Sequence, residues 1–159
     1  MSTSRTSRSV SRTQLTQFLG VPRLMRAEKP WTPSGHIETC ILLSVKPIEF
    51  VGNSLDDLRE FPVGARRECG YHLDRVQHGF DPSDWKPMPT VGSGVREIRV
   101  REQGGAFRVI YVAKLADRVY VLHCFQKRTQ QTARADLDLA GRRYKQIVSE
   151  VQDRAGERT

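Results

Sequence analysis

Basic side chains gather in the second half of the chain, in short runs that alternate with apolar residues. Between residues 94 and 128 there are eight basic and three acidic residues, a net charge of +5 in a chain whose formal charge is +8. Arginine and lysine at fixed positions bind phosphate oxygens through charge-assisted hydrogen bonds. This distribution favours a polyanionic partner such as nucleic acid. The cations that we expect to bind RNA are Arg96, Arg99, Arg101, Arg108, Lys127 and Arg128.

Arg99 and Arg101 lie in a run, Val95–Arg101, that has the alternation of a strand. Because successive side chains of a strand point to opposite faces, both arginines project together, on the face that Glu97 shares. A solvated strand face is the alternative interpretation of these two residues.

Arg108 stands inside the apolar run Phe107–Tyr111, which has the composition of a central strand. An unpaired charge in such a place costs several kcal/mol, on the order of the penalty for a buried ion. Arg108 therefore needs a bound anion or a nearby carboxylate. A structural salt bridge to Glu97 or Glu102 is the alternative to a phosphate contact.

His123 and Glu97 are the candidate groups for proton transfer. His123 lies in the strand-like run Val121–Phe125, shortly before the pair Lys127 and Arg128. Imidazole can accept or donate a proton near neutral pH. A packed, hydrogen-bonded histidine is the alternative, and the sequence leaves the identity of the general base open. The predicted catalytic set is Arg108, Lys127, Arg128, His123 and Glu97.

A small α+β domain is expected to position these residues, with the element order β-α-α-β-β-β-α and a mainly antiparallel sheet packed on helices. The expected strands cover residues 46–51, 95–101, 106–113 and 118–125. The first helix is expected to be capped by Ser54 and to end at Pro62, which opens a second helix that ends at Gly79. A third helix is expected to be capped by Thr132. Residues 81–94 contain three prolines and two glycines, a composition that predicts a loop.

The two ends of the chain differ from this domain in composition. Residues 1–44 are predicted to be a disordered basic extension, because their composition cannot bury enough apolar surface to offset chain entropy. A flexible tail that contacts RNA is the alternative. The domain is expected to span residues 45–152, and residues 153–159 are expected to form a polar tail.

The cysteines and the hydropathy indicate the compartment. Cys40, Cys69 and Cys124 are an odd number of widely spaced thiols, which predicts reduced cysteines in a cytoplasmic protein and no zinc site. No apolar run approaches the roughly 18 residues that a membrane helix needs. We therefore expect no metal, no cofactor and no membrane association.

Three blocks of sequence, in this order, resemble the phage-related HigB branch of the RelE/ParE toxin superfamily. They are Gly94–Arg99, Phe107–Tyr111 and Leu122–Thr132, and the resemblance covers about residues 45 to 150. It implies a RelE-like fold and a toxin of a type II toxin–antitoxin system that cleaves mRNA in the ribosomal A site. It also implies an antitoxin partner, often a helix-turn-helix protein encoded by the adjacent gene.

Within this resemblance the family's sheet arginine corresponds to Arg108. Its basic pair after the last strand corresponds to Lys127 and Arg128, and its first-strand basic positions to Arg99 and Arg101. This chain has Glu97 where some relatives carry a further basic residue, which leaves the general base unsettled.

The chemistry implied is cleavage by the RNA's own 2′-hydroxyl, which needs alignment, proton transfer and stabilisation of the phosphorane but no metal. Arg108 and Arg128 would stabilise the phosphorane, Lys127 and Arg99 would hold flanking phosphates, and His123 or Glu97 would move protons. All of this requires Arg99, Arg108 and Lys127 to converge from three neighbouring strands in one shallow pocket shaped for a backbone phosphate, rather than on different sides of the molecule. A ParE-like inhibitor of DNA gyrase and an inactive RNA-binding phage remnant are the alternative functions.

Relatives commonly begin with Met, Lys and a short hydrophobic strand, and Val45–Phe50 resembles that start with Val in place of Met. We therefore hypothesise that translation begins at Val45 through a GTG codon. The intact mass of natively expressed protein tests this hypothesis, and a mass that includes residue 1 would contradict it.

Overall fold

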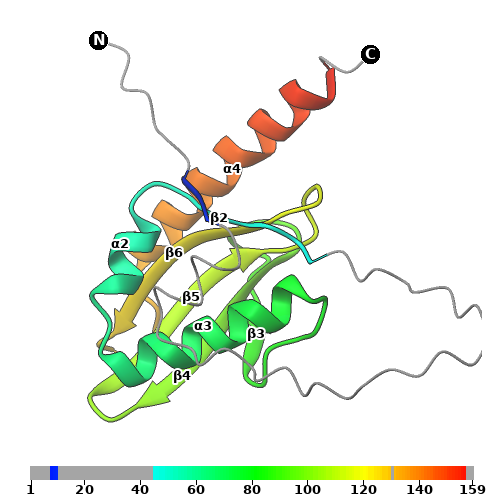
Figure 1. The fold of residues 1–159 in the computed structure, drawn as a ribbon. Helices are drawn as coiled ribbons and strands as arrows, with labels where there is room; N and C mark the ends of the chain where they lie inside the picture. Colours follow the sequence, from blue (N-terminus) through cyan, green and yellow to red (C-terminus); the bar gives the residue numbers. More distant parts are fainter. Residues whose placement is uncertain (1–7, 11–44, 130, 157–159) are drawn as a thin grey trace, which may run out of the picture.

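The chain folds as an α+β domain in the computed structural model, which describes residues 8–10, 45–129 and 131–156. Figure 1 shows α3 lying across the sheet and α4 projecting beyond it. The strands are β1 (Arg8–Val10), β2 (Ile48–Phe50), β3 (Trp85–Pro87), β4 (Val95–Glu102), β5 (Gly105–Val112) and β6 (Val119–Lys127). The helices are α2 (Ser54–Arg59), α3 (Val63–Gln77) and α4 (Arg134–Gly156).

The strands form one mixed sheet in the order β1-β2-β6-β5-β4-β3. The consecutive strands β4, β5 and β6 form the predicted antiparallel meander, while β2 pairs in parallel with β6. The meander therefore supplies the centre of the sheet, and the cations expected on it come from neighbouring strands.

Two apolar cores cover opposite faces of this sheet, because alternate strand residues point to opposite sides. On one face Ile98, Val100 and Val109 pack with residues of α2 and α3. On the other face Ile110 and Leu122 pack with residues of α4 and of the loop after β3. The predicted layers of helix and sheet are thus confirmed, with the helices divided between the two faces.

Two strands were not predicted. Trp85–Pro87 forms β3 within the segment expected to be a loop, and pairs with β4 at the edge of the sheet. An edge position tolerates Pro87, because the missing N–H is not needed on the outer side. Arg8–Val10 forms β1 and pairs with β2, within the segment predicted to be disordered. The remaining residues of the 1–44 extension lie outside the part of the chain that the structure describes.

The observed helix ends agree in part with the caps and stops predicted from the sequence. Pro62 separates α2 from α3, and Gly79 follows α3 with a φ of 83°, a left-handed conformation that favours glycine. Ser54 is the first residue of α2 rather than its cap, and its hydroxyl donates to the carbonyl of Val121. Helix α4 starts at Arg134, after the predicted cap Thr132, and continues to Gly156 into the predicted tail. No helix in the described ranges is long and apolar enough to cross a membrane.

The second half of β6 extends beyond the short strand β2, so side chains rather than a neighbouring strand meet its edge. Arg143 of α4 donates to the carbonyl of Leu122 at 2.7 Å and also contacts Asn53. Gly52, with a φ of 62°, leaves room for this guanidinium, since a Cβ there would lie 2.9 Å from Nη2 of Arg143. These contacts bring the start of α2 and helix α4 to the same edge of the sheet.

Candidate nucleic-acid interface

The cations of the meander lie in register on one face of the sheet. Arg99 of β4 is directly opposite Arg108 of β5, and Arg108 is directly opposite Phe125 of β6. In the next row of the same face, Arg101, Ala106 and Lys127 are opposite one another. Arg99, Arg108 and Lys127 therefore project from three neighbouring strands to one face of the sheet rather than to different sides of the molecule.

Arg108 and Glu97 form a buried ion pair at the centre of this face. Arg108 is 5% exposed and Glu97 is 2% exposed. Nε of Arg108 lies 3.4 Å from Oε1 of Glu97, and Nη1 donates to the carbonyls of Phe107 and Val100. Burial lowers the pKa of Arg108 and the charge of Glu97 opposes this shift. The salt bridge to Glu97 that the sequence left as an alternative is thus present.

This pair leaves two groups without a hydrogen bond. Within the described ranges, Oε2 of Glu97 is buried and has no hydrogen-bond partner. Nε of Arg108 is likewise buried without a hydrogen-bond partner in the described structure, although it lies 3.4 Å from Oε1 of Glu97. One buried proton acceptor and one buried donor therefore remain without a hydrogen bond at the centre of the face.

More accessible cations surround the buried pair. Arg99 has a side chain that is 35% exposed and contacts Asp84 at 2.5 Å, at the start of β3. Arg101 and Arg128 are exposed, and Lys127 is partly exposed. A phosphate that approaches the sheet would meet these groups before Arg108.

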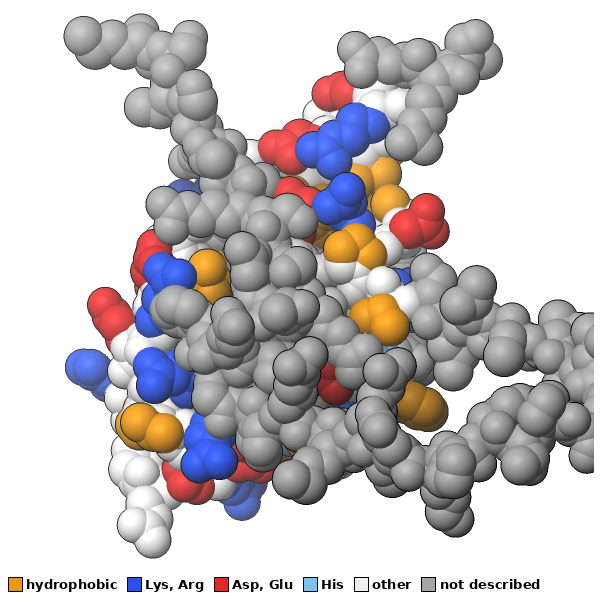
Figure 2. All heavy atoms as spheres, viewed as in Figure 1, with side chains coloured by type: hydrophobic (Ala, Val, Ile, Leu, Met, Phe, Trp, Pro, Cys, Tyr) orange, Lys and Arg blue, Asp and Glu red, His pale blue; other side chains and the backbone are white. Residues whose placement is uncertain are grey.

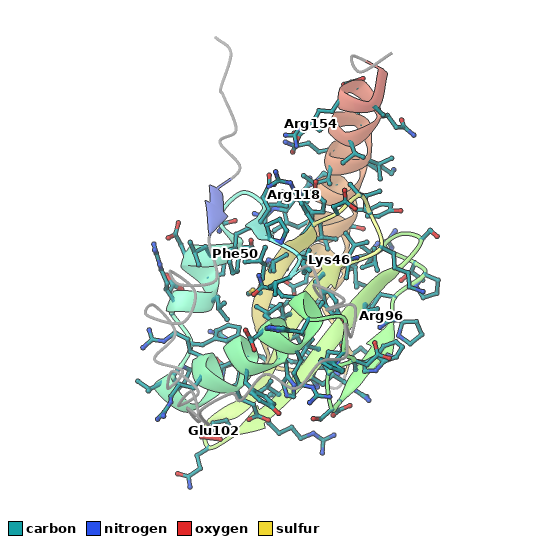
Figure 3. The ribbon with its side chains drawn as sticks, turned by 45° about the vertical axis from the view of Figure 1, so that its right-hand side comes forward. Lys46, Phe50, Arg96, Glu102, Arg118 and Arg154 are labelled. Carbon is teal, nitrogen blue, oxygen red and sulfur yellow. The ribbon has the colours of Figure 1, made fainter. Side chains whose placement is uncertain are left out.

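Arg96 does not belong with this set, although the sequence grouped it with the RNA-binding arginines. It lies one residue from Glu97 and so projects to the other face, where it stacks on Trp85 at 4.0 Å and pairs with Asp81 at 2.5 Å. Figure 3 labels Arg96 and Glu102 at opposite ends of β4. Counting charge alone misplaced Arg96, because the alternation of the strand decides which face it serves.

His123 lies next to the cationic rows and is held by two carboxylates. It is opposite Ile110, which is opposite Glu97, so His123 shares the face of Arg108. Its Nε2 lies 2.9 Å from Oδ1 of Asp136 on α4, and its Nδ1 lies 3.6 Å from Oδ2 of Asp57 on α2. The interpretation of His123 as a hydrogen-bonded residue therefore holds, and its partners come from two helices.

Asp57, Asp84 and Asp136 are the residues of this face that sequence reasoning missed as site residues. Each lies in or beside a helix start or a loop, where an acidic residue is ordinary. The sequence indicates only that a buried histidine or arginine needs an acidic partner. Any of the 18 acidic residues of the chain could be that partner.

Helix α4 offers a different kind of surface. On the face seen in Figure 2, basic and acidic side chains alternate along its projecting part. Such a mixed surface gives no continuous cationic track for a phosphate backbone. Among the residues that the structure describes, no group of three or more His, Cys, Asp or Glu side chains could hold a metal ion.

Comparison with known proteins agrees with the phage-related character of the sequence. No curated protein sequence matches the chain. A family model, phage-derived protein Gp49-like (DUF891), matches residues 56–145, which run from α2 into α4 and include the whole meander. The chain therefore belongs to the phage-derived Gp49-like family, which is associated with RelE-type, toxin-like proteins.

Proposed function

We propose that this protein is the toxin of a type II toxin–antitoxin system, of the RelE/HigB kind, and that it cleaves mRNA on the ribosome without a metal. The observation that carries the proposal is the direct opposition of Arg99 and Arg108, next to the row that holds Arg101 and Lys127. Like charges opposite each other destabilise a sheet. Glu97 and Asp84 offset part of the charge of this pair, and a phosphate would offset the rest together with that of Arg101 and Lys127.

A carboxylate among the cations favours a nuclease over a surface that only binds. Glu97 weakens phosphate binding by its charge, and its Oε2 makes no hydrogen bond within the described part of the chain. We assign the general base to Glu97, because its carboxylate lies beside Arg108, the cation assigned to the phosphorane. His123 is then left for the second proton transfer.

The reaction follows from these assignments. Glu97 takes the proton of the 2′-hydroxyl, the 2′-oxygen forms a bond to phosphorus, and the bond from phosphorus to the 5′-oxygen breaks. The 5′-oxygen takes a proton from His123. Arg108 stabilises the phosphorane, while Arg99 and Lys127 hold flanking phosphates. The products are a 2′,3′-cyclic phosphate and a 5′-hydroxyl.

The proposed partners follow from the same assignment. They are mRNA on the ribosome and a cognate antitoxin, which we expect to be a helix-turn-helix protein encoded beside this gene. This proposal places the protein in the cytoplasm.

Mapping of mRNA ends after induced expression tests the proposed function. We expect new 5′-hydroxyl ends within coding sequences, together with arrest of translation. Toxicity with intact mRNA and blocked replication would contradict the proposal and support inhibition of gyrase. Neither toxicity nor cleavage would support an inactive RNA-binding remnant.

A further inference from the structure

Helices α2 and α4 each place one carboxylate against the imidazole of His123, from opposite sides of the ring. Asp136 lies in the first turn of α4 and Asp57 in the first turn of α2. The side chain of His123 is 9% exposed, so the ring has little water to satisfy its nitrogens. All three residues lie within the segment that the family model matches.

The two sides of the ring are not equivalent. The contact of Nε2 with Asp136, at 2.9 Å, is a hydrogen bond, and an ionised carboxylate can only accept, so Nε2 carries a hydrogen. The distance from Nδ1 to Asp57, 3.6 Å, is too long for a hydrogen bond. Nδ1 of His123 and Oδ2 of Asp57 are both buried atoms without a hydrogen-bond partner in the described structure. Nε2 is therefore fixed in a hydrogen bond, whereas Nδ1 is buried beside Asp57 without one.

We propose that Asp136 and Asp57 are positioning residues for proton donation by His123, an inference that rests on the proposed function. Asp136 fixes the orientation and tautomer of the ring through Nε2. Asp57 stabilises the positive charge that the ring carries while both nitrogens hold protons. When RNA binds, the contact between Nδ1 and Asp57 opens and the proton on Nδ1 passes to the 5′-oxygen. The neutral ring that remains keeps its hydrogen on Nε2.

The surroundings of the cluster act on both Asp57 and the ring of His123. Burial raises the pKa of Asp57, and the charges of His123 and Arg143 oppose the shift. The ring of His123 stacks on Phe125, with centroids 5.2 Å apart, and Phe125 lies directly opposite Arg108. The ring is thereby held beside the cation that we assign to the phosphorane.

The test compares Asp136→Asn with the matched control Asp138→Asn, and Asp57→Asn with Asp56→Asn. Asp138 and Asp56 lie on the same helices, with side chains 66% and 58% exposed. Asp136→Asn should lower kcat for RNA cleavage about a hundredfold and leave KM nearly unchanged, since general acid–base catalysis contributes roughly 10²- to 10⁴-fold. Asp57→Asn should lower kcat about tenfold, and the two controls should match the wild type.

A spectroscopic readout separates this inference from the proposed function. In ¹⁵N NMR, assigned with His123→Gln, the neutral ring should carry its hydrogen on Nε2, and Asp136→Asn should shift it towards Nδ1. Unchanged kcat in Asp136→Asn beside an active wild type would overturn the inference alone. Lower thermal stability with unchanged kcat would do the same, since it would mean that the cluster only anchors the helices. A wild type that keeps the Nε2 tautomer but never cleaves RNA would overturn the function and the catalytic role together.

Discussion

Arg108→Ala is expected to lower the rate of RNA cleavage by about 10²- to 10³-fold, the loss that follows removal of one preorganised donor to a developing oxyanion. The backbone carbonyls of Phe107 and Val100 and the carboxylate of Glu97 hold the Arg108 guanidinium in place. It therefore needs no reorganisation when the phosphorane forms. Single-turnover cleavage of ribosome-bound mRNA measures the effect.

Two further variants make this result interpretable. Arg108→Lys retains a charge beside Glu97 but lacks the planar fork, so we expect it to fold and to remain strongly impaired. Arg67→Ala removes an exposed arginine from α3, on the other side of the sheet, and should cleave like the wild type. Cleavage by folded Arg108→Ala at a rate close to that of the wild type would remove Arg108 from the mechanism.

Breaking the ion pair of Glu97 and Arg108 is expected to give the largest loss of stability at this site. Either Glu97→Leu or Arg108→Met leaves the other charge buried and unpaired, which costs about 3 to 5 kcal/mol. The double variant Glu97→Leu/Arg108→Met removes both charges and should recover most of that loss, although it should not cleave RNA. Urea unfolding of the four proteins gives the coupling free energy directly.

The exposed pair of Arg134 and Asp138 is the control for this cycle. Its atoms are 4.0 Å apart and its side chains are 94% and 66% exposed, so Asp138→Ala should change stability little. If the losses of unfolding free energy in the two single variants simply add up in the double variant, the two charges do not stabilise each other. Glu97 would then not hold Arg108 in place for the phosphorane.

The helices and the meander could be predicted because each has a strong local pattern. Apolar residues of α3 recur at helical spacing, and the strands β4, β5 and β6 alternate between short turns. The need of Arg108 for a carboxylate also followed from its apolar neighbours, and Glu97 was one of the two partners considered. The register of the sheet confirms that Arg99, Arg108 and Lys127 share one face.

The features that could not be predicted depend on contacts between segments that are far apart in the sequence. Arg143 looks like a surface residue in a polar helix, yet it is buried against the edge of β6. The strand β3 has three residues and a proline, too little for a periodic signal. Asp57 and Asp136 gain their place beside His123 only because α2 and α4 meet at the same edge. None of these contacts leaves a local signature in the sequence.

Two charge reversals of equal size test most directly whether RNA binds the face of the sheet that carries Arg99, Arg101 and Lys127. Arg101→Glu and Arg67→Glu change the net charge equally, and both positions are exposed, on opposite sides of the sheet. The affinity for a short RNA at fixed salt should fall at least about tenfold in Arg101→Glu and change much less in Arg67→Glu. Equal losses in both variants, or a larger loss in Arg67→Glu, would contradict the assignment of RNA to this face.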